Sequence, residues 1–193
     1  MNIDKMIYLV VGRQGSGKTL WMVYRAYKHY LEGLKVYSNI HLKFPYKKLD
    51  YNKIVNCEYK NAVIIIDEAQ LLLSSRRSMS KVSISIVDGF ISMARKNNLK
   101  IYLSTQFPFK VDIRIREEKD FMFMCERHAY IGNSWCKILN PDSLPYDVPV
   151  MIKIFIQDSF DHNTVEDCLH ANPYYPLYDT SQVVRIENLE VKK

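Results

Sequence analysis

Residues 6–19 constrain the fold of this chain more than any other stretch. The apolar run Met6–Val11 leads directly into Gly12-Arg13-Gln14-Gly15-Ser16-Gly17-Lys18-Thr19, which has the pattern G-x-x-x-x-G-K-[ST]. An apolar run before this pattern and a helical pattern after it are the context that identifies a phosphate-binding P-loop. Its glycines let backbone N–H groups surround an anion, and the start of the helix adds the positive end of its dipole. The stretch therefore predicts a nucleotide-binding α/β fold.

The P-loop pattern also assigns individual residues to a bound nucleotide. We expect Lys18 to reach the β- and γ-phosphates of ATP and the Thr19 hydroxyl to bind Mg²⁺. The residues expected to contact the nucleotide are Gly12, Arg13, Gln14, Gly15, Ser16, Gly17, Lys18, Thr19 and Leu20. ATP and Mg²⁺ are therefore the expected substrate and metal.

Apolar periodicity divides the chain into alternating strands and helices. The unbroken aliphatic run at 62–66 predicts a strand that is buried on both faces. Other strands are expected at 35–42, 100–106, 121–131 and 150–157, and helices at 18–32 and 82–96. The start of the second helix, VSISI, also fits a strand, so its boundary stays open. Residues 43–60 show no assignable pattern, and 69–81 suggest a helical turn followed by an exposed loop.

This alternation predicts one P-loop NTPase domain of the RecA or additional-strand type over 1–193. Its central sheet should be mostly parallel and flanked by helices, with 121–131 and 150–157 as late antiparallel strands. The motifs fall within about 5–160, and the segment from about 172 to 193, which contains Pro173 and Pro176, is expected to be irregular. In such a sheet the nucleotide lies at the carboxyl ends of the strands.

Composition restricts the protein class only loosely. The net charge of +6 and the pI near 9.0 are compatible with a polyanionic partner and equally with an ordinary basic protein. No apolar run approaches the roughly 20 residues of a membrane-spanning helix, so we expect no membrane span. The four cysteines form no C-x-x-C pair, which argues against a zinc site and favours free thiols in the cytoplasm.

Two acidic residues after the buried strand carry the expected chemistry. Asp67 occupies the Walker B position and should hold Mg²⁺, usually through water. Glu68 can orient and deprotonate a water molecule that attacks the γ-phosphate. A nucleoside or nucleotide kinase gains nothing from such a residue, so the pair favours an ATPase over a kinase or a non-hydrolysing switch. Gln106 ends the next strand, where it can sense hydrolysis.

Several later motifs occur in an order that carries a family resemblance. They are DEAQ at 67–70, Ala94-Arg95-Lys96-Asn97, Ser104-Thr105-Gln106, Pro108, Ile115-Arg116 and Asp120-Phe121-Met122-Phe123. From Asp67 to Phe123 the chain resembles the HerA/FtsK superfamily, in particular viral genome-packaging ATPases and the related zonula occludens toxin (Zot)-like proteins. Arg95 is followed by Lys where the family frequently has His, a mild departure.

The resemblance implies a homo-oligomeric ring, usually a hexamer, that hydrolyses ATP and pumps double-stranded DNA. It also implies an arginine finger donated to the ATP of a neighbouring subunit, for which Arg116 is the first choice, Arg114 the second and Arg95 the third. Arg76, Arg77 and Lys81 lie in a Ser-rich stretch and are possible contacts to DNA phosphates, although a solvated loop explains them equally well.

Two viral functions fit this resemblance. A packaging ATPase would act with a capsid or portal-vertex protein, in the host cytoplasm and transiently at the assembling capsid. A Zot-like ATPase would instead serve the morphogenesis and extrusion of a filamentous particle. We favour packaging, because Zot-like proteins usually carry a spanning segment after this core and the sequence has none. A nucleoside or nucleotide kinase is the alternative of another class.

Overall fold

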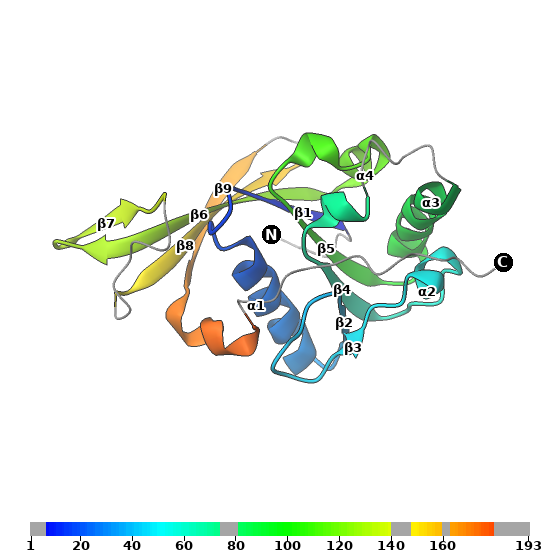
Figure 1. The fold of residues 1–193 in the computed structure, drawn as a ribbon, viewed down its shortest axis with the longest axis horizontal. Helices are drawn as coiled ribbons and strands as arrows, with labels where there is room; N and C mark the ends of the chain where they lie inside the picture. Colours follow the sequence, from blue (N-terminus) through cyan, green and yellow to red (C-terminus); the bar gives the residue numbers. More distant parts are fainter. Residues whose placement is uncertain (1–6, 74–80, 140–147, 160–162, 180–193) are drawn as a thin grey trace.

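A nine-stranded sheet organises the part of the chain that the computed structural model describes, which is residues 7–73, 81–139, 148–159 and 163–179. The strands are β1 (Ile7–Val11), β2 (Lys35–Ser38), β3 (Lys47–Lys48), β4 (Ala62–Ile66), β5 (Leu99–Thr105), β6 (Phe121–Ile131), β7 (Ser134–Lys137), β8 (Val150–Asp158) and β9 (Thr164–His170). They lie in the order β3-β2-β4-β5-β1-β6-β8-β9, and β7 pairs with β6 to form a hairpin that projects from one end (Figure 1).

The directions of the strands confirm a mostly parallel sheet with late antiparallel strands. All pairs from β3 across to β6 are parallel, whereas β8 runs antiparallel to β6 and β9 antiparallel to β8. One expectation needs correction. The strand at 121–131 is antiparallel to β7 and β8, but it runs parallel to β1, with Phe121 opposite Tyr8. The reason is that α4 (Ile113–Glu118) carries the chain back along the sheet before β6 begins, and such a crossover makes the following strand parallel.

The position of β5 between β4 and β1 is the additional-strand arrangement that the sequence predicts. Because β1, β4 and β5 are mutually parallel, their carboxyl ends meet at one edge of the sheet. The P-loop follows β1 at that edge, Asp67 follows β4 and Gln106 follows β5. The fold therefore gathers the P-loop, Asp67 and Gln106 at one edge of the sheet.

Helices cover both faces of this sheet (Figure 1). The helix α1 (Lys18–Leu31) lies on one face, over a core that includes Tyr8, Trp21 and Tyr102. The helices α2 (Tyr51–Val55), α3 (Lys81–Lys96) and α4 lie on the other face, over a core that includes Ile64 and Phe90. Because both faces are covered, every residue of β4 is buried, which explains its unbroken aliphatic sequence. The ambiguous VSISI stretch is helical.

The structure departs from expectation where backbone pairing depends on distant residues. The strand expected at 35–42 ends at Ser38, because the next residue, Asn39, turns its amide toward the backbone of Asp67. Residues 43–60, left unassigned, contain β3 and α2, and β9 follows position 160.

The C-terminal segment is partly ordered rather than irregular throughout. Residues Asn172–Leu177 form the 3-10 helix η5 beside α1, where the ring centroids of Tyr174 and Tyr24 are 4.7 Å apart. Leu42 then forms an isolated bridge with Tyr178. This segment therefore runs from β9 past α1 to the segment that follows β2.

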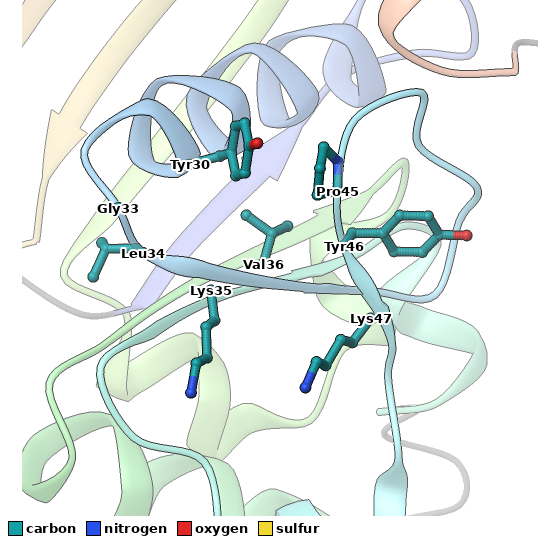
Figure 2. A pocket seen from close by; sticks show the side chains of 8 residues that line it. All are labelled: Tyr30, Gly33, Leu34, Lys35, Val36, Pro45, Tyr46 and Lys47. Carbon is teal, nitrogen blue, oxygen red and sulfur yellow. The ribbon is translucent and has the colours of Figure 1, made fainter.

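A pocket of about 280 Å³ lies at the amino end of β2, the opposite end of that strand from Asn39 (Figure 2). Tyr30, Val36 and Pro45 face the hollow, whereas Lys35 and Lys47 point away from it side by side. The pocket is therefore separate from the P-loop edge of the sheet. Within the described ranges, no helix is long and apolar enough to cross a membrane.

Candidate functional site

The P-loop rests directly on β6 and β8, and only glycine fits at two of its positions. A Cβ atom on Gly12, whose φ is 151°, would lie 2.8 Å from the Cys125 carbonyl oxygen of β6. A Cβ atom on Gly17, whose φ is 95°, would lie 2.3 Å from Cδ1 of Ile152 in β8. Both glycines therefore allow a close backbone approach and a left-handed conformation that a side chain would oppose.

Lys18 lies within the curl of the loop. Its Nζ donates hydrogen bonds to the carbonyl oxygens of Gly12 and Arg13, at 3.0 and 2.9 Å. Burial lowers the pKa of Lys18, and the nearby carboxylates of Glu68 and Asp67 oppose that shift. The Oγ atom of Ser16 is also buried and has no hydrogen-bond partner among the described residues. The loop thus holds an ammonium and a spare hydroxyl, which suit the oxygens of a phosphate chain.

Asp67 is connected to the P-loop by a hydrogen bond. Thr19 Oγ1 donates to Asp67 Oδ2 at 3.0 Å, and the hydroxyl of Ser104 donates to the other carboxylate oxygen. Burial raises the pKa of Asp67, while the bonds from Ser104 and Thr19 act in the opposite direction. A hydroxyl and a carboxylate are hard oxygen ligands of the kind that Mg²⁺ prefers. Thr19 and Asp67 therefore fit the metal that accompanies a nucleotide.

Two residues to which the sequence assigned no role of their own position Asp67. The side-chain amide of Asn39 donates to the carbonyl oxygen of Asp67 at 2.9 Å and accepts from its N–H at 2.8 Å. Ser104 Oγ accepts a hydrogen bond from the N–H of Glu68 at 3.0 Å. Asn39 and Ser104 thus fix the end of β4. Ser104 belongs to the Ser-Thr-Gln motif, but nothing in the local sequence identifies Asn39, because its partner lies on another strand.

The Glu68 side chain reaches Gln106 at the end of β5. Its backbone has a φ of 53°, in the left-handed region. Gln106 Nε2 donates to Glu68 Oε1 at 3.2 Å, and the amide of Gln70 donates to Oε2. The structure therefore brings the expected Glu68 and Gln106 together. A carboxylate held between two amide donors is oriented and can accept a proton from a water molecule.

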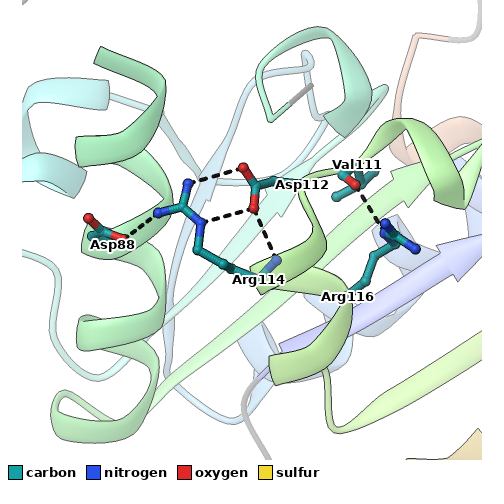
Figure 3. Close-up of polar contacts among 5 residues, drawn as sticks. All are labelled: Asp88, Val111, Asp112, Arg114 and Arg116. Atoms are coloured by element: carbon teal, nitrogen blue, oxygen red, sulfur yellow. Dashed lines mark hydrogen bonds and ion pairs between the residues drawn. The ribbon is translucent and has the colours of Figure 1, made fainter. Parts of the chain in front are cut away.

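The two arginines of α4 have different surroundings (Figure 3). Arg114 is paired with two carboxylates, at 2.8 Å from Oδ1 of Asp88 and 3.0 Å from Oδ1 of Asp112. Arg116 Nε donates to the carbonyl oxygen of Val111 at 3.1 Å. No carboxylate of the described residues forms an ion pair with Arg116, so its charge is the less committed of the two.

The remaining expected cations are only partly described. Arg76 and Arg77 lie outside the described residues. Lys81 and Arg95 belong to α3, and the structure does not describe their side chains. Their expected roles in DNA contact and as a third arginine finger stay predictions.

A comparison with known proteins supports the same fold. The family model described as Zonular occludens toxin (Zot) matches residues 45–148, a range that includes Asp67, Glu68, Gln106 and Arg116. No curated protein sequence gives a significant match.

Three solved structures resemble the chain over most of its length. The first is the N-terminal domain of zonular occludens toxin from Neisseria meningitidis, with 19% identity, a TM-score of 0.62, and coverage of 91% of this chain and 99% of that one. The second is the genome packaging NTPase B204 from Sulfolobus turreted icosahedral virus 2 in complex with ATP-gammaS. Its sequence identity is 16% and its TM-score 0.54, and the match covers 86% of this chain and 98% of that one. The third is a DnaB-like replicative helicase. Its sequence identity is 12% and its TM-score 0.55, and the match covers 85% of this chain and 54% of that one. These likenesses establish a fold shared with P-loop ATPases.

Proposed function

We propose that this chain, which belongs to the zonular occludens toxin (Zot) family, is an ATP-hydrolysing motor that translocates double-stranded DNA. The observation that carries the ATPase assignment is the placement of Glu68. Its carboxylate is held by Gln106 at the end of β5, while the neighbouring Asp67 is bonded to the P-loop residue Thr19. A water-activating carboxylate next to a Mg²⁺–nucleotide site is what hydrolysis requires and what a kinase does not need.

Each residue of the site has a step in this reaction. Lys18 and the loop N–H groups hold the β- and γ-phosphates of ATP. Thr19 and Asp67 would hold Mg²⁺, which would supply positive charge to neutralise those phosphates. The water oxygen attacks the γ-phosphorus while Glu68 accepts a proton from that water molecule. The bond between the γ-phosphorus and the oxygen that bridges it to the β-phosphate breaks, and ADP leaves. Gln106, bonded to Glu68, transmits the change along β5 toward α4.

We assign the motor to a homo-oligomeric ring, with six subunits as the family resemblance suggests. Arg116 lies on α4 without a carboxylate partner among the described residues, which suits a finger donated to a neighbouring subunit. In this proposal the ring packages a viral genome, acting in the host cytoplasm and transiently with a capsid or portal-vertex protein.

A second function has its own support. The family match, together with the TM-score of 0.62 to the N-terminal domain of zonular occludens toxin, favours a Zot-like ATPase for the morphogenesis and extrusion of a filamentous particle. The catalytic residues would act identically in both functions. The two differ in the polymer or partner that stimulates hydrolysis.

The rate of ATP hydrolysis with and without linear double-stranded DNA, measured over a salt series, tests this assignment. A packaging motor should be stimulated by DNA, and the stimulation should fade as salt rises, because contacts to phosphates release counterions. Hydrolysis that is indifferent to DNA would favour the morphogenesis function. A requirement for a nucleoside acceptor would overturn both, since that is the reaction of a kinase.

A further inference from the structure

We propose that Arg127 and Tyr175 form the subsite for the nucleoside end of bound ATP. The inference rests on the proposed function, because it needs a nucleotide at the P-loop. It goes further by assigning the base and ribose to residues of β6 and η5 that belong to none of the P-loop, Walker B or arginine-finger motifs.

The register of the sheet places Arg127 beside the P-loop. Arg127 of β6 lies directly opposite Ile152 of β8. Directly opposed residues of an antiparallel pair project from the same face of a sheet. Ile152 is the side chain that Gly17 rests on, so Arg127 projects from the face that carries the P-loop and the start of α1.

The orientation of the phosphate chain directs the nucleoside toward this side. The γ-phosphate end of the site is fixed by Asp67 after β4 and by Glu68 with Gln106 after β5. Both strands lie on one side of β1, and β6 and β8 lie on the other side. With the β-phosphate inside the loop, the α-phosphate and the nucleoside must leave on the side opposite the γ-phosphate, over β6 and β8.

Arg127 and Tyr175 are built as a stacking platform there. Arg127 Nη2 donates to the Tyr175 hydroxyl at 2.9 Å, and the guanidinium carbon lies 5.7 Å from the centre of the Tyr175 ring. The Nε atom of Arg127 is buried and has no partner among the described residues, and no described carboxylate pairs with it. A guanidinium plane and an aromatic ring both stack on bases regardless of base identity.

Tyr178 links this platform to the metal end of the site. Its isolated bridge is to Leu42, three residues after Asn39, whose side-chain amide is bonded to the Asp67 carbonyl oxygen. Tyr178 follows η5, and its bridge to Leu42 holds it on the far side of α1 from β9. The segment from Tyr175 to Tyr178 thus spans the distance from the expected nucleoside end to the Walker B carboxylate.

Equilibrium titration calorimetry separates the nucleoside from the phosphates when it compares Mg-tripolyphosphate with the Mg complex of a non-hydrolysable ATP analogue, which stands in for ATP. For Arg127→Gln and for Tyr175→Leu we expect ATP to bind about tenfold more weakly, as the loss of one stacking partner predicts, while tripolyphosphate affinity changes less than about twofold. Lys153→Gln is the matched control. Lys153 follows Ile152 in β8, so its side chain projects from the opposite face of the sheet. Its replacement removes a positive charge there and should change neither affinity.

Other outcomes would overturn the subsite. Unchanged ATP affinity in Arg127→Gln would show that nothing of the nucleotide rests there, and an equal loss for both ligands would assign Arg127 to the phosphates or to folding. If Arg127→Gln unfolds at a lower temperature, Arg127→Lys keeps the charge but not the planar group and should show the same selective loss of ATP binding. Wild-type protein that binds neither ligand would overturn the proposed function itself.

Discussion

Asp67 and Glu68 are neighbours in the chain, yet their carboxylates serve different partners. Asp67 directly follows β4, and its carboxylate accepts hydrogen bonds from the hydroxyls of Thr19 and Ser104. Glu68 has a left-handed backbone conformation, with a φ of 53°, and its carboxylate accepts a hydrogen bond from the amide of Gln106. For a residue with a side chain, such a conformation costs on the order of 1–3 kcal/mol and persists where the surroundings impose it. In the proposed mechanism this arrangement would direct the Asp67 carboxylate at Mg²⁺ and the Glu68 carboxylate at the attacking water.

At the residue scale, the role of Glu68 as general base makes a direct prediction. Glu68→Gln should keep ATP affinity, because the Glu68 carboxylate is hydrogen-bonded to Gln106 and Gln70 and not to the P-loop, and should lower turnover by about 10²–10⁴-fold. Calorimetric binding and a steady-state phosphate-release assay measure the two quantities. Glu58→Gln, a change at an exposed glutamate bonded to Asn56, is the control. Turnover retained in Glu68→Gln would remove Glu68 from the mechanism.

Ser104 makes a second prediction at the same scale. Ser104→Ala removes the donor to Asp67 and leaves the Glu68 N–H without its acceptor, so stability should fall by about 1–3 kcal/mol. It should also raise the Mg²⁺ concentration for half-maximal turnover, since the Ser104 bond favours the charged form of Asp67. Urea unfolding and a Mg²⁺ titration measure these effects. Thr105→Val loses a similar local bond, to the Phe107 N–H, and should leave the Mg²⁺ requirement unchanged.

At the scale of elements, a strand is predictable from the sequence to the extent that its side chains are buried. All five residues of β4 are buried, and its apolar run predicts the strand with its observed bounds. In β9 only Leu169 is buried, so TVEDCLH shows no strand alternation and the strand is invisible in the sequence. α2 and α4, of five and six residues, are too short for a helical period to emerge.

The candidate site follows a similar rule. Lys18, Thr19, Asp67, Glu68 and Gln106 were predictable because each belongs to a motif whose spacing is set within one loop or strand end. Residues that act on the site through a distant backbone, such as Asn39, become visible only once β2 and β4 are paired.

The last turn of α1 carries a prediction about pH. His29 is buried between the Tyr102 hydroxyl and Glu32, at 3.0 and 2.8 Å. Burial lowers its pKa, and the Glu32 hydrogen bond only partly opposes that shift. Below the unfolded-state pKa of about 6.5, the unfolded chain therefore binds more protons at this residue than the folded chain.

Stability contributed by neutral His29 should be present above that pKa and lost as pH falls from 7 to 5, with a slope of at most about 1.4 kcal/mol per pH unit. Chemical unfolding of wild type and of His29→Gln across this range measures the effect, and the variant should show the shallower dependence. Parallel pH curves for the two proteins would show that His29 does not titrate on unfolding.

At the scale of the whole molecule, α4 offers one anchored and one available arginine. Arg114 ties α4 to α3 through Asp88 and also binds Asp112, whose pKa its hydrogen bonds hold below the usual range. Arg116, by contrast, donates to the backbone carbonyl of Val111, and its guanidinium carbon lies 5.7 Å from the centre of the Phe109 ring. Because the carbonyl and the ring are neutral, Arg116 can leave them for a phosphate at lower cost than Arg114 could leave two carboxylates.

Mixing two inactive variants tests whether Arg116 acts on the ATP of a neighbouring subunit. Arg116→Ala keeps Glu68 but lacks the finger, and Glu68→Gln keeps the finger but lacks the base. In a ring built from head-to-tail contacts, a subunit of the first kind beside one of the second restores a complete site, and an equal mixture should form such pairs at roughly a quarter of its interfaces. We therefore expect the mixture to regain up to about a quarter of wild-type hydrolysis, measured as phosphate release after co-assembly.

Arg114→Ala in place of Arg116→Ala is the control, because loss of an anchor within one subunit cannot be supplied by its neighbour. Absence of recovery at every mixing ratio would mean that Arg116 acts within its own subunit or takes no part in hydrolysis.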